Sequence, residues 1–127
     1  MKDFTLYPEA LDLNELEFNE PCFGYYITIG EWFPASYPYS GTEYPKNSDM
    51  PDSTWATAPT YSQAFRWFRE KHGMVFNLVG SGPYYPSIAF ILIDGNSDIE
   101  LGEYDNYEEA ELASLKKMIE IVKASQA

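Results

Sequence analysis

The chain has 127 residues and carries 20 acidic against 8 basic side chains, which gives a formal net charge of −12. Direct nucleic-acid binding is disfavoured, because phosphate contacts need clustered Lys and Arg. A single cysteine, Cys22, excludes an internal disulfide framework. No run reaches the roughly 18 apolar residues of a membrane span, and the start lacks the apolar core of a signal peptide. These features predict one cytoplasmic domain over residues 1–127 with no membrane partner.

The first third of the chain predicts a helix and a strand. A helix is expected from Tyr7 to Phe18, because leucines recur on one face and acidic residues lie near its start. The aromatic and β-branched run from Phe23 to Trp32 is typical of a strand. Within it, Gly24 and Gly30 indicate a bulge or a close backbone approach.

The segment at about 33–59 is the irregular part of the chain. Prolines interrupt every regular pattern there, yet its aromatic content is unlike that of a disordered segment. We therefore expect an ordered Tyr/Pro-rich loop, either a recognition loop or a lid over one edge of the core. The aromatic residues that argue against disorder are Trp32, Phe33, Tyr37, Tyr39, Tyr44 and Trp55.

The stretch from Thr60 to Val79 predicts a capped helix, a stop and a strand. Thr60 is the expected N-cap, and Gly73 the expected left-handed residue that ends the helix. His72 is interpreted as a positive charge at the carbonyl end of the helix dipole. An apolar stripe is expected at Tyr61, Ala64, Phe65 and Phe68. Arg66, Trp67 and Arg69 are expected to be partly exposed; a solvated helix face is favoured there, and binding of an anion or a partner's carboxylate is the alternative.

The remaining residues predict a hairpin meander and a final helix. Gly80 to Pro86 is expected to connect two strands, and Ser87 to Ile93 to form a central strand buried on both faces. Asp94 to Asp98 is interpreted as a turn and not a calcium loop, and Ile99 to Glu103 as an edge strand. Asp105 is the expected N-cap of the last helix.

No catalytic, cofactor or metal site is predicted. A nucleophile would need Cys22 beside the only histidine, His72, and no motif supports that pair. A lone histidine cannot build a metal site. The twenty carboxylates give no informative acid–base pair, so the sequence assigns no reaction, and a role other than an enzyme is favoured.

Three segments together resemble small uncharacterised proteins encoded by phages, prophages and mobile elements of gut bacteria. They are Glu20 to Tyr26, Ala64 to His72, and Tyr107 to Ala113 with Leu115 to Lys117. The resemblance implies a bacterial or phage origin and carries no activity or site residues with it.

The sequence therefore predicts an α+β fold, with an antiparallel sheet of three to four strands and about three helices packed on it. The best function hypothesis is a small acidic interaction protein of phage or mobile-element origin that binds a host or phage protein, or a second copy of itself. Alternatives are a small-molecule pocket or enzyme beneath the loop, and an acidic mimic of nucleic acid that inhibits a host protein. The predicted interaction residues are Trp32, Tyr37, Tyr39, Tyr44, Trp55, Arg66, Trp67 and Arg69.

Overall fold

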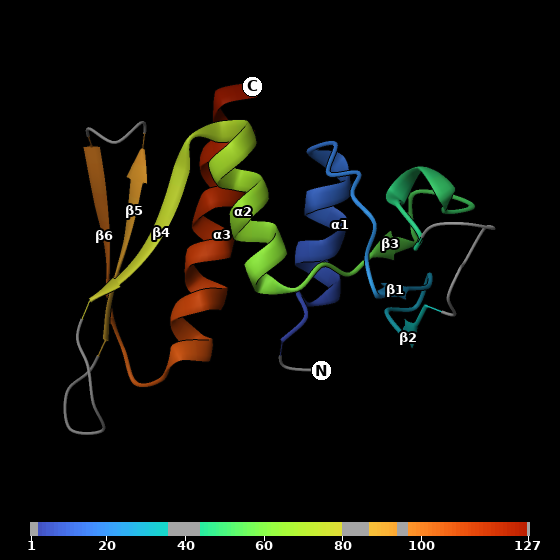
Figure 1. Cartoon of the computed structure of the whole chain (residues 1–127), viewed down its shortest axis with the longest axis horizontal. Coiled ribbons are helices and arrows are strands. Elements are labelled where there is room, and N and C mark those ends of the chain that lie inside the picture. Colours follow the sequence, from blue (N-terminus) through green and yellow to red (C-terminus); the bar gives the residue numbers. More distant parts are fainter. Residues whose placement is uncertain (1–2, 36–43, 80–86, 94–96, 127) are drawn as a thin grey trace. The chain divides into compact units, whose positions relative to one another are not determined.

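A computed structural model of the chain describes residues 3–35, 44–79, 87–93 and 97–126. These residues form three α-helices and two three-stranded antiparallel sheets, which confirms the α+β class. The chain divides into two compact units, Met1–Thr60 and Tyr61–Ala127, and each unit contains one of the sheets (Figure 1). The expectation of a single domain stays a prediction.

The first unit begins with α1 (Tyr7–Glu15), which is shorter than the expected helix from Tyr7 to Phe18. The helix ends early because Glu17 takes a left-handed conformation with φ of 71°. This turn lets the Phe18 amide donate to the Leu13 carbonyl at 2.9 Å and places the Phe18 side chain in the core. The backbone reversal at Glu17 therefore ends the helix.

The expected single strand from Phe23 to Trp32 is wrong, because the chain reverses within this run and a short strand lies on each side of the turn. The two strands are β1 (Gly24–Tyr26) and β2 (Trp32–Pro34), which pair antiparallel with Tyr25 opposite Phe33. Gly30 has a φ of 82° and donates its amide to the Ile27 carbonyl at 2.8 Å, which closes the turn between them. A positive φ is readily adopted only by glycine, so Gly30 marks a reversal of the chain.

The described part of the Tyr/Pro-rich loop contains a short 3₁₀-helix, η1 (Asn47–Asp49), and strand β3 (Ala56–Thr57), which pairs with the other edge of β1. The Asn47 side chain forms hydrogen bonds to both the segment after α1 and strand β3. Its side-chain amide donates to the Phe18 carbonyl at 2.7 Å, and its side-chain oxygen accepts from the Thr57 amide at 2.8 Å. The sheet order is β2-β1-β3, and the part of the expected loop at residues 36–43 lies outside the described residues.

The core of the first unit lies between α1 and one face of this sheet. Ala10, Tyr26, Ala56 and Ala58 form its buried centre, with Phe4, Tyr7, Leu11 and Trp32 packed around them. The Tyr26 hydroxyl donates to the Thr5 carbonyl at 2.7 Å. Tyr26 is a buried phenol whose pKa is raised by loss of solvent and by the nearby Glu9 carboxylate.

The second unit begins with α2 (Tyr61–His72) and β4 (Met74–Val79). Gly73 separates them with a φ of 65°, and its amide donates to the Arg69 carbonyl at 3.2 Å, which confirms the predicted stop. The Thr60 cap stays a prediction, and α2 begins at the residue that follows it.

Strands β4, β5 (Ser87–Ile93) and β6 (Ser97–Tyr104) form a meander with β5 in the centre, as predicted. The β5–β6 pairing contains an irregularity: Phe90 lies opposite Glu100 and Ala89 opposite Gly102, so Leu101 is an extra residue in β6. The predicted connection from Gly80 to Pro86 and residues 94–96 of the turn predicted at Asp94 to Asp98 lie outside the described residues, but the strands on either side of each are antiparallel neighbours. Ser97 and Asp98 belong to β6, so the prediction of a turn is wrong at these two positions.

Helix α3 (Tyr107–Gln126) completes the second unit, and it buries an apolar stripe of Leu115, Met118, Ile119 and Val122. The predicted cap at Asp105 is wrong by one residue. The Asn106 side-chain oxygen accepts from the Glu109 amide at 2.8 Å, so Asn106 caps the helix. Asn and Asp are equally good N-cap residues. Asn106 is the cap because it immediately precedes the first helical residue, Tyr107.

Candidate functional site

The sheet of the first unit has one face against α1 and one face turned away from it. Side chains alternate along a strand, so Tyr26 and Trp32, which lie opposite each other, point to the α1 side. Tyr25 and Phe33 form the next pair and point outward. The outward face therefore begins with two aromatic side chains on neighbouring strands.

A stack of three aromatic rings crosses this outward face. The centroid of the Tyr25 ring lies 6.0 Å from that of Phe33 and 5.9 Å from that of Trp55. The planes of Tyr25 and Phe33 differ by 25°, and those of Tyr25 and Trp55 by only 8°. All three side chains are half-buried, because each ring covers part of its neighbour and leaves the remainder to solvent.

A second aromatic pair extends the same surface. Phe23 precedes Tyr25 by two residues, and its carbonyl accepts from the Ala35 amide at 2.8 Å, which continues the β1–β2 pairing. The Phe23 side chain is 58% exposed and meets the ring of Tyr44 edge-on, with centroids 4.9 Å apart. We call the set Phe23, Tyr25, Phe33, Tyr44 and Trp55 the aromatic face.

Two of the predicted interaction residues, Tyr44 and Trp55, lie in the aromatic face. Trp32 lies on the opposite side of the sheet, where its ring packs against Phe4 with centroids 5.3 Å apart. Tyr37 and Tyr39 are outside the described residues. Sequence reasoning missed Tyr25, Phe23 and Phe33 as members, although the alternation of Phe23 and Tyr25 along one strand was a signal for a shared face.

The other predicted residues belong to α2 in the second unit. Arg66 and Arg69 are exposed, as expected. The expected partial exposure of Trp67 is wrong, because its side chain is only 4% exposed and packs edge-on against Phe68 with centroids 5.0 Å apart. The three residues therefore do not form one exposed cluster.

The interpretation of His72 as a positive charge at the helix end also needs correction. Its ring meets the rings of Trp67 and Phe68, with centroids 5.0 Å and 5.8 Å away. Burial lowers the pKa of His72 below 6.5, because the charged imidazolium loses solvent among these aromatic rings. His72 is therefore a neutral packing residue at pH 7.

A pH titration tests this assignment. The chain has one histidine, so its imidazole Cε1–H resonance is unambiguous, and we expect it to titrate with a pKa below 6.5. Between the lowered pKa of native His72 and the ordinary histidine pKa of about 6.5 in the unfolded chain, the unfolded chain binds more protons than the native chain. The free energy of unfolding therefore falls as the pH drops from the unfolded pKa to the native one. A His72→Gln variant should lose this pH dependence. A native pKa above 6.5 would contradict the packing role.

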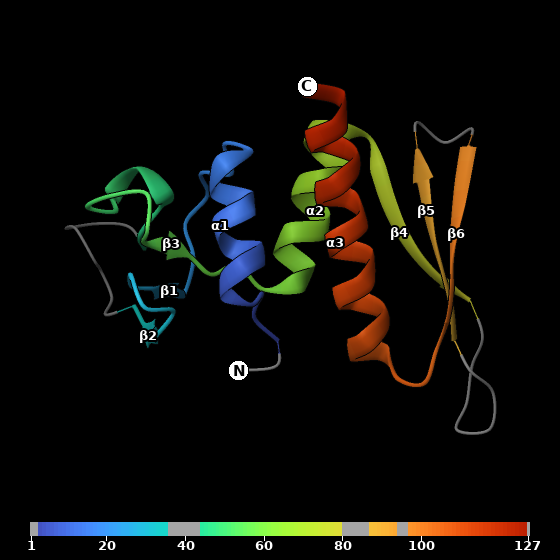
Figure 2. The same ribbon diagram turned by 180° about the vertical axis from the view of Figure 1, so that it is seen from behind.

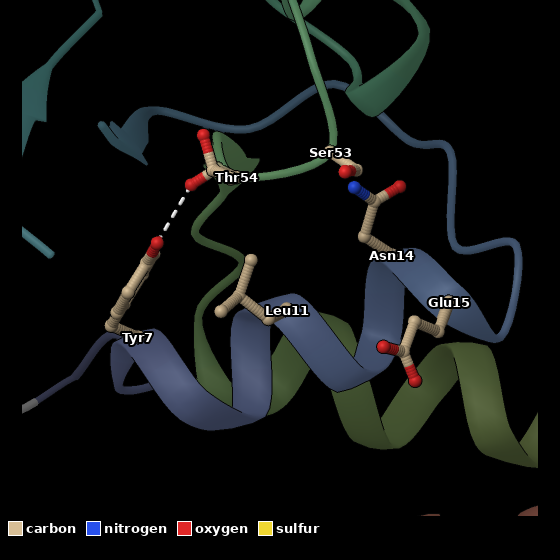
Figure 3. A pocket seen from close by; sticks show the side chains of 6 residues that line it. All are labelled: Tyr7, Leu11, Asn14, Glu15, Ser53 and Thr54. Carbon is tan, nitrogen blue, oxygen red and sulfur yellow. Dashed lines mark hydrogen bonds between the residues drawn. The ribbon is translucent and has the colours of Figure 1, made fainter. Parts of the chain in front are cut away.

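A small pocket lies between α1 and the segment that leads into β3 (Figure 3). Its volume is about 300 Å³, which is at the lower end for small-molecule sites. The lining residues are Tyr7, Leu11, Asn14, Glu15, Ser53 and Thr54. Four of the six are polar and not aromatic, which suits hydrogen bonding to a small hydrophilic compound.

Hydrogen bonds fix one wall of this pocket. The Tyr7 hydroxyl contacts the carbonyl oxygens of Thr54 at 2.7 Å and of Thr28 at 2.9 Å. The Thr54 hydroxyl donates to the Asp52 carboxylate, so the Thr28 hydroxyl donates to Thr54 Oγ1 at 2.8 Å. The bonds from the Thr54 hydroxyl and amide lower the pKa of Asp52.

The described residues contain no group of three or more His, Cys, Asp or Glu side chains that could hold a metal ion. Cys22 is buried, and its thiol donates to the Glu20 carbonyl at 3.4 Å. A buried thiol of this kind is inert as a nucleophile by default. Across the described part of the chain, no helix is both long and apolar enough to cross a membrane.

Comparisons with protein-family models, with curated proteins and with solved structures found no match to this chain. The resemblance to small proteins of phages and mobile elements therefore stays a prediction.

Proposed function

We propose that the chain is a protein-binding module that contacts its partner through the aromatic face. The observation that carries this proposal is the ring stack Phe33–Tyr25–Trp55 on the side of the sheet away from the α1 core. Tyr and Trp combine a large apolar body with a polar tip, and aromatic residues are enriched at protein interfaces for that reason.

Charge favours a basic partner. Residues 1–60 contain ten acidic side chains and only two basic ones, Lys2 and Lys46. A field of one sign steers an oppositely charged protein toward the surface and raises the association rate. The resemblance described above makes a host or phage protein the proposed partner, and a single, buried cysteine, Cys22, suits a reducing cytoplasm.

Capture from a lysate of the proposed bacterial host, followed by reconstitution, tests this function. A Tyr25→Ser/Trp55→Ser variant removes the centre of the stack, and Tyr107→Ser removes an exposed tyrosine from α3 as a matched control. We expect wild type and the control to capture the same specific protein and the double variant to lose it. With the purified partner, the double variant should bind about 30-fold more weakly, the loss of one interface hot spot.

Retention of the partner by the double variant would contradict the proposal, and so would an equal loss in the control. Circular dichroism must first show that the double variant is folded. If it is not, Phe23→Ser replaces it, because Phe23 is the most exposed ring of the five and its loss disturbs the core least.

A second candidate function is binding of a small polar molecule, and the pocket beside Ser53 and Thr54 is the observation that favours it. It lies against the loop under which a pocket was expected. A Ser53→Trp variant should fill the pocket, while Ser62→Trp places the same ring on the exposed face of α2. A metabolite that shifts the Leu11 methyl resonances in wild type and Ser62→Trp, but not in Ser53→Trp, would support this function. Shifts that persist in Ser53→Trp would contradict it.

A nucleic-acid mimic needs carboxylates arrayed on one face. Of the acidic residues from 94 to 111, Glu100 and Glu103 lie on β6, and Glu108, Glu109 and Glu111 lie on α3, which packs on the opposite face of the sheet. This division does not favour the mimic.

A further inference from the structure

Among the residues that the structure describes, helices cover only one face of the sheet in the second unit. Met74 and Ile91 point to the helix side and are buried. Phe76 points to the same side, and its ring stacks on that of Phe65 in α2 with centroids 4.6 Å apart. Tyr107 of α3 meets the same Phe76 ring from 6.2 Å. Figures 1 and 2 show α2 and α3 on the same side of strands β4, β5 and β6.

On β4 and β5 the opposite face is mainly apolar. The residues that alternate with the helix-facing ones are Val75, Val79, Ile88, Phe90 and Leu92, and the exposed Asn77 lies between the two valines. Val75 and Val79 are 37% and 49% exposed, and the three β5 residues are half-buried. We call this set the open sheet face. It corrects the expectation that β5 is buried on both faces, because the helices cover only one.

An antiparallel sheet with one solvated face usually carries polar residues there. Exposed apolar patches of this kind mark interaction sites in monomeric proteins. The open sheet face is therefore a candidate interaction surface, and the charges at its border indicate which kind of partner it fits.

Carboxylates border the open sheet face along β6. Glu100 lies opposite Phe90 and Glu103 lies opposite Ile88, and both are exposed. Asn77 lies opposite Phe90 on the β4 side. The three strands contain no Lys, Arg or His at any position, so nothing on the sheet itself neutralises this border.

We propose that the open sheet face binds an amphipathic helix of a partner protein, whose apolar stripe carries Lys or Arg on the flank that lies over β6. Helices are the usual layer on the face of a small sheet. The seven residues of β5 span about 23 Å, a length that roughly 15 helical residues match. The basic flank would pair with Glu100 and Glu103.

Charge argues against a second copy as the occupant. Two copies would bring the carboxylates of both β6 strands to one interface, with no cation from either sheet to offset them. Like charges at an interface oppose association. The proposed site uses none of the residues of the aromatic face, so it stands whether or not that function is correct.

Fluorescence anisotropy with designed helices of about 15 residues tests the proposal. One labelled helix has a leucine stripe flanked by lysines, and a second has glutamates in place of the lysines. We expect the lysine helix to bind and the glutamate helix to fail. Val75→Thr/Val79→Thr should weaken binding about tenfold, because each hydroxyl replaces a methyl group that the bound helix would bury. Glu100→Gln/Glu103→Gln should weaken it and flatten its salt dependence.

The control variant is Ile29→Thr, which replaces an exposed apolar side chain of the first unit by a hydroxyl-bearing one and should leave the affinity unchanged. A lysine–serine peptide of the same charge measures general attraction to an acidic protein. Binding of that peptide as tightly as the lysine helix would overturn the proposal, as would full affinity of the valine variant. A dimer in light scattering that Val75→Thr/Val79→Thr dissociates would assign the face to a second copy and also overturn it. If the double variant unfolds, Val79→Thr alone serves, since it is the more exposed valine.

Discussion

Phe68→Ala is expected to lower the free energy of unfolding by about 3–5 kcal/mol, the usual cost of removing a buried phenylalanine. Phe68 is fully buried on α2, and its ring contacts those of Trp67 and His72. Neighbouring aromatic rings are too stiff to collapse into the space that an alanine would leave. The lost transfer free energy and the residual cavity should therefore both contribute.

Urea unfolding followed by circular dichroism measures this cost. Ser62→Ala on the exposed face of the same helix is the control, and its effect should stay within about 0.5 kcal/mol. A loss below about 1 kcal/mol for Phe68→Ala would mean that this side chain does not belong to the core.

Gly24→Ala is expected to destabilise the first unit by about 1–3 kcal/mol, the range for overpacking. A Cβ atom on Gly24 would lie 2.5 Å from Cζ2 and 2.6 Å from Nε1 of Trp32. Trp32 cannot move aside easily, because its ring packs against Phe4 and its backbone pairs with Tyr26.

A double-mutant cycle isolates the steric cause. In a Trp32→Ala background the same Gly24→Ala change should cost much less, because the ring that it meets is gone. Gly102→Ala is a useful comparison, because it introduces strain without a clash. Apart from the two chain neighbours of Gly102, no atom of the described residues lies within 4 Å of the added Cβ, but the φ of 120° is strained for any residue other than glycine. Equal costs of Gly24→Ala in both backgrounds would contradict a clash with Trp32.

The second unit could be predicted largely from sequence. The 3.6-residue spacing of apolar side chains predicts α2 and α3, and Gly73 separates the helix from β4 with the expected left-handed conformation. These signals are local, because a helix and its stop depend on residues near one another in the chain. The burial of Trp67 could not be read from the same spacing, because it depends on packing beyond the helix.

The first unit could be predicted less well, because its pairing is not local. The run from Phe23 to Trp32 has the composition of one strand, and only the conformation of Gly30 shows that it reverses. Strand β3 comes from inside a segment with the composition of a loop and pairs with β1 far earlier in the chain. Tyr44 and Trp55 could be predicted as interaction residues from their residue type. Their ring contacts with Phe23 and Tyr25 depend on how the loop packs against β1, which no local pattern shows.

The extra residue in β6 has a consequence for how the molecules meet one another at high concentration. An edge strand with regular, unpaired amides and carbonyls is a template on which a strand from another molecule can add. Leu101 interrupts that regular spacing, and Gly102 turns the backbone with a φ of 120° just beyond it. Glu100 and Glu103 place negative charge on either side of the interruption. The outer edge of β6 is therefore a poor starting point for fibril growth by strand addition.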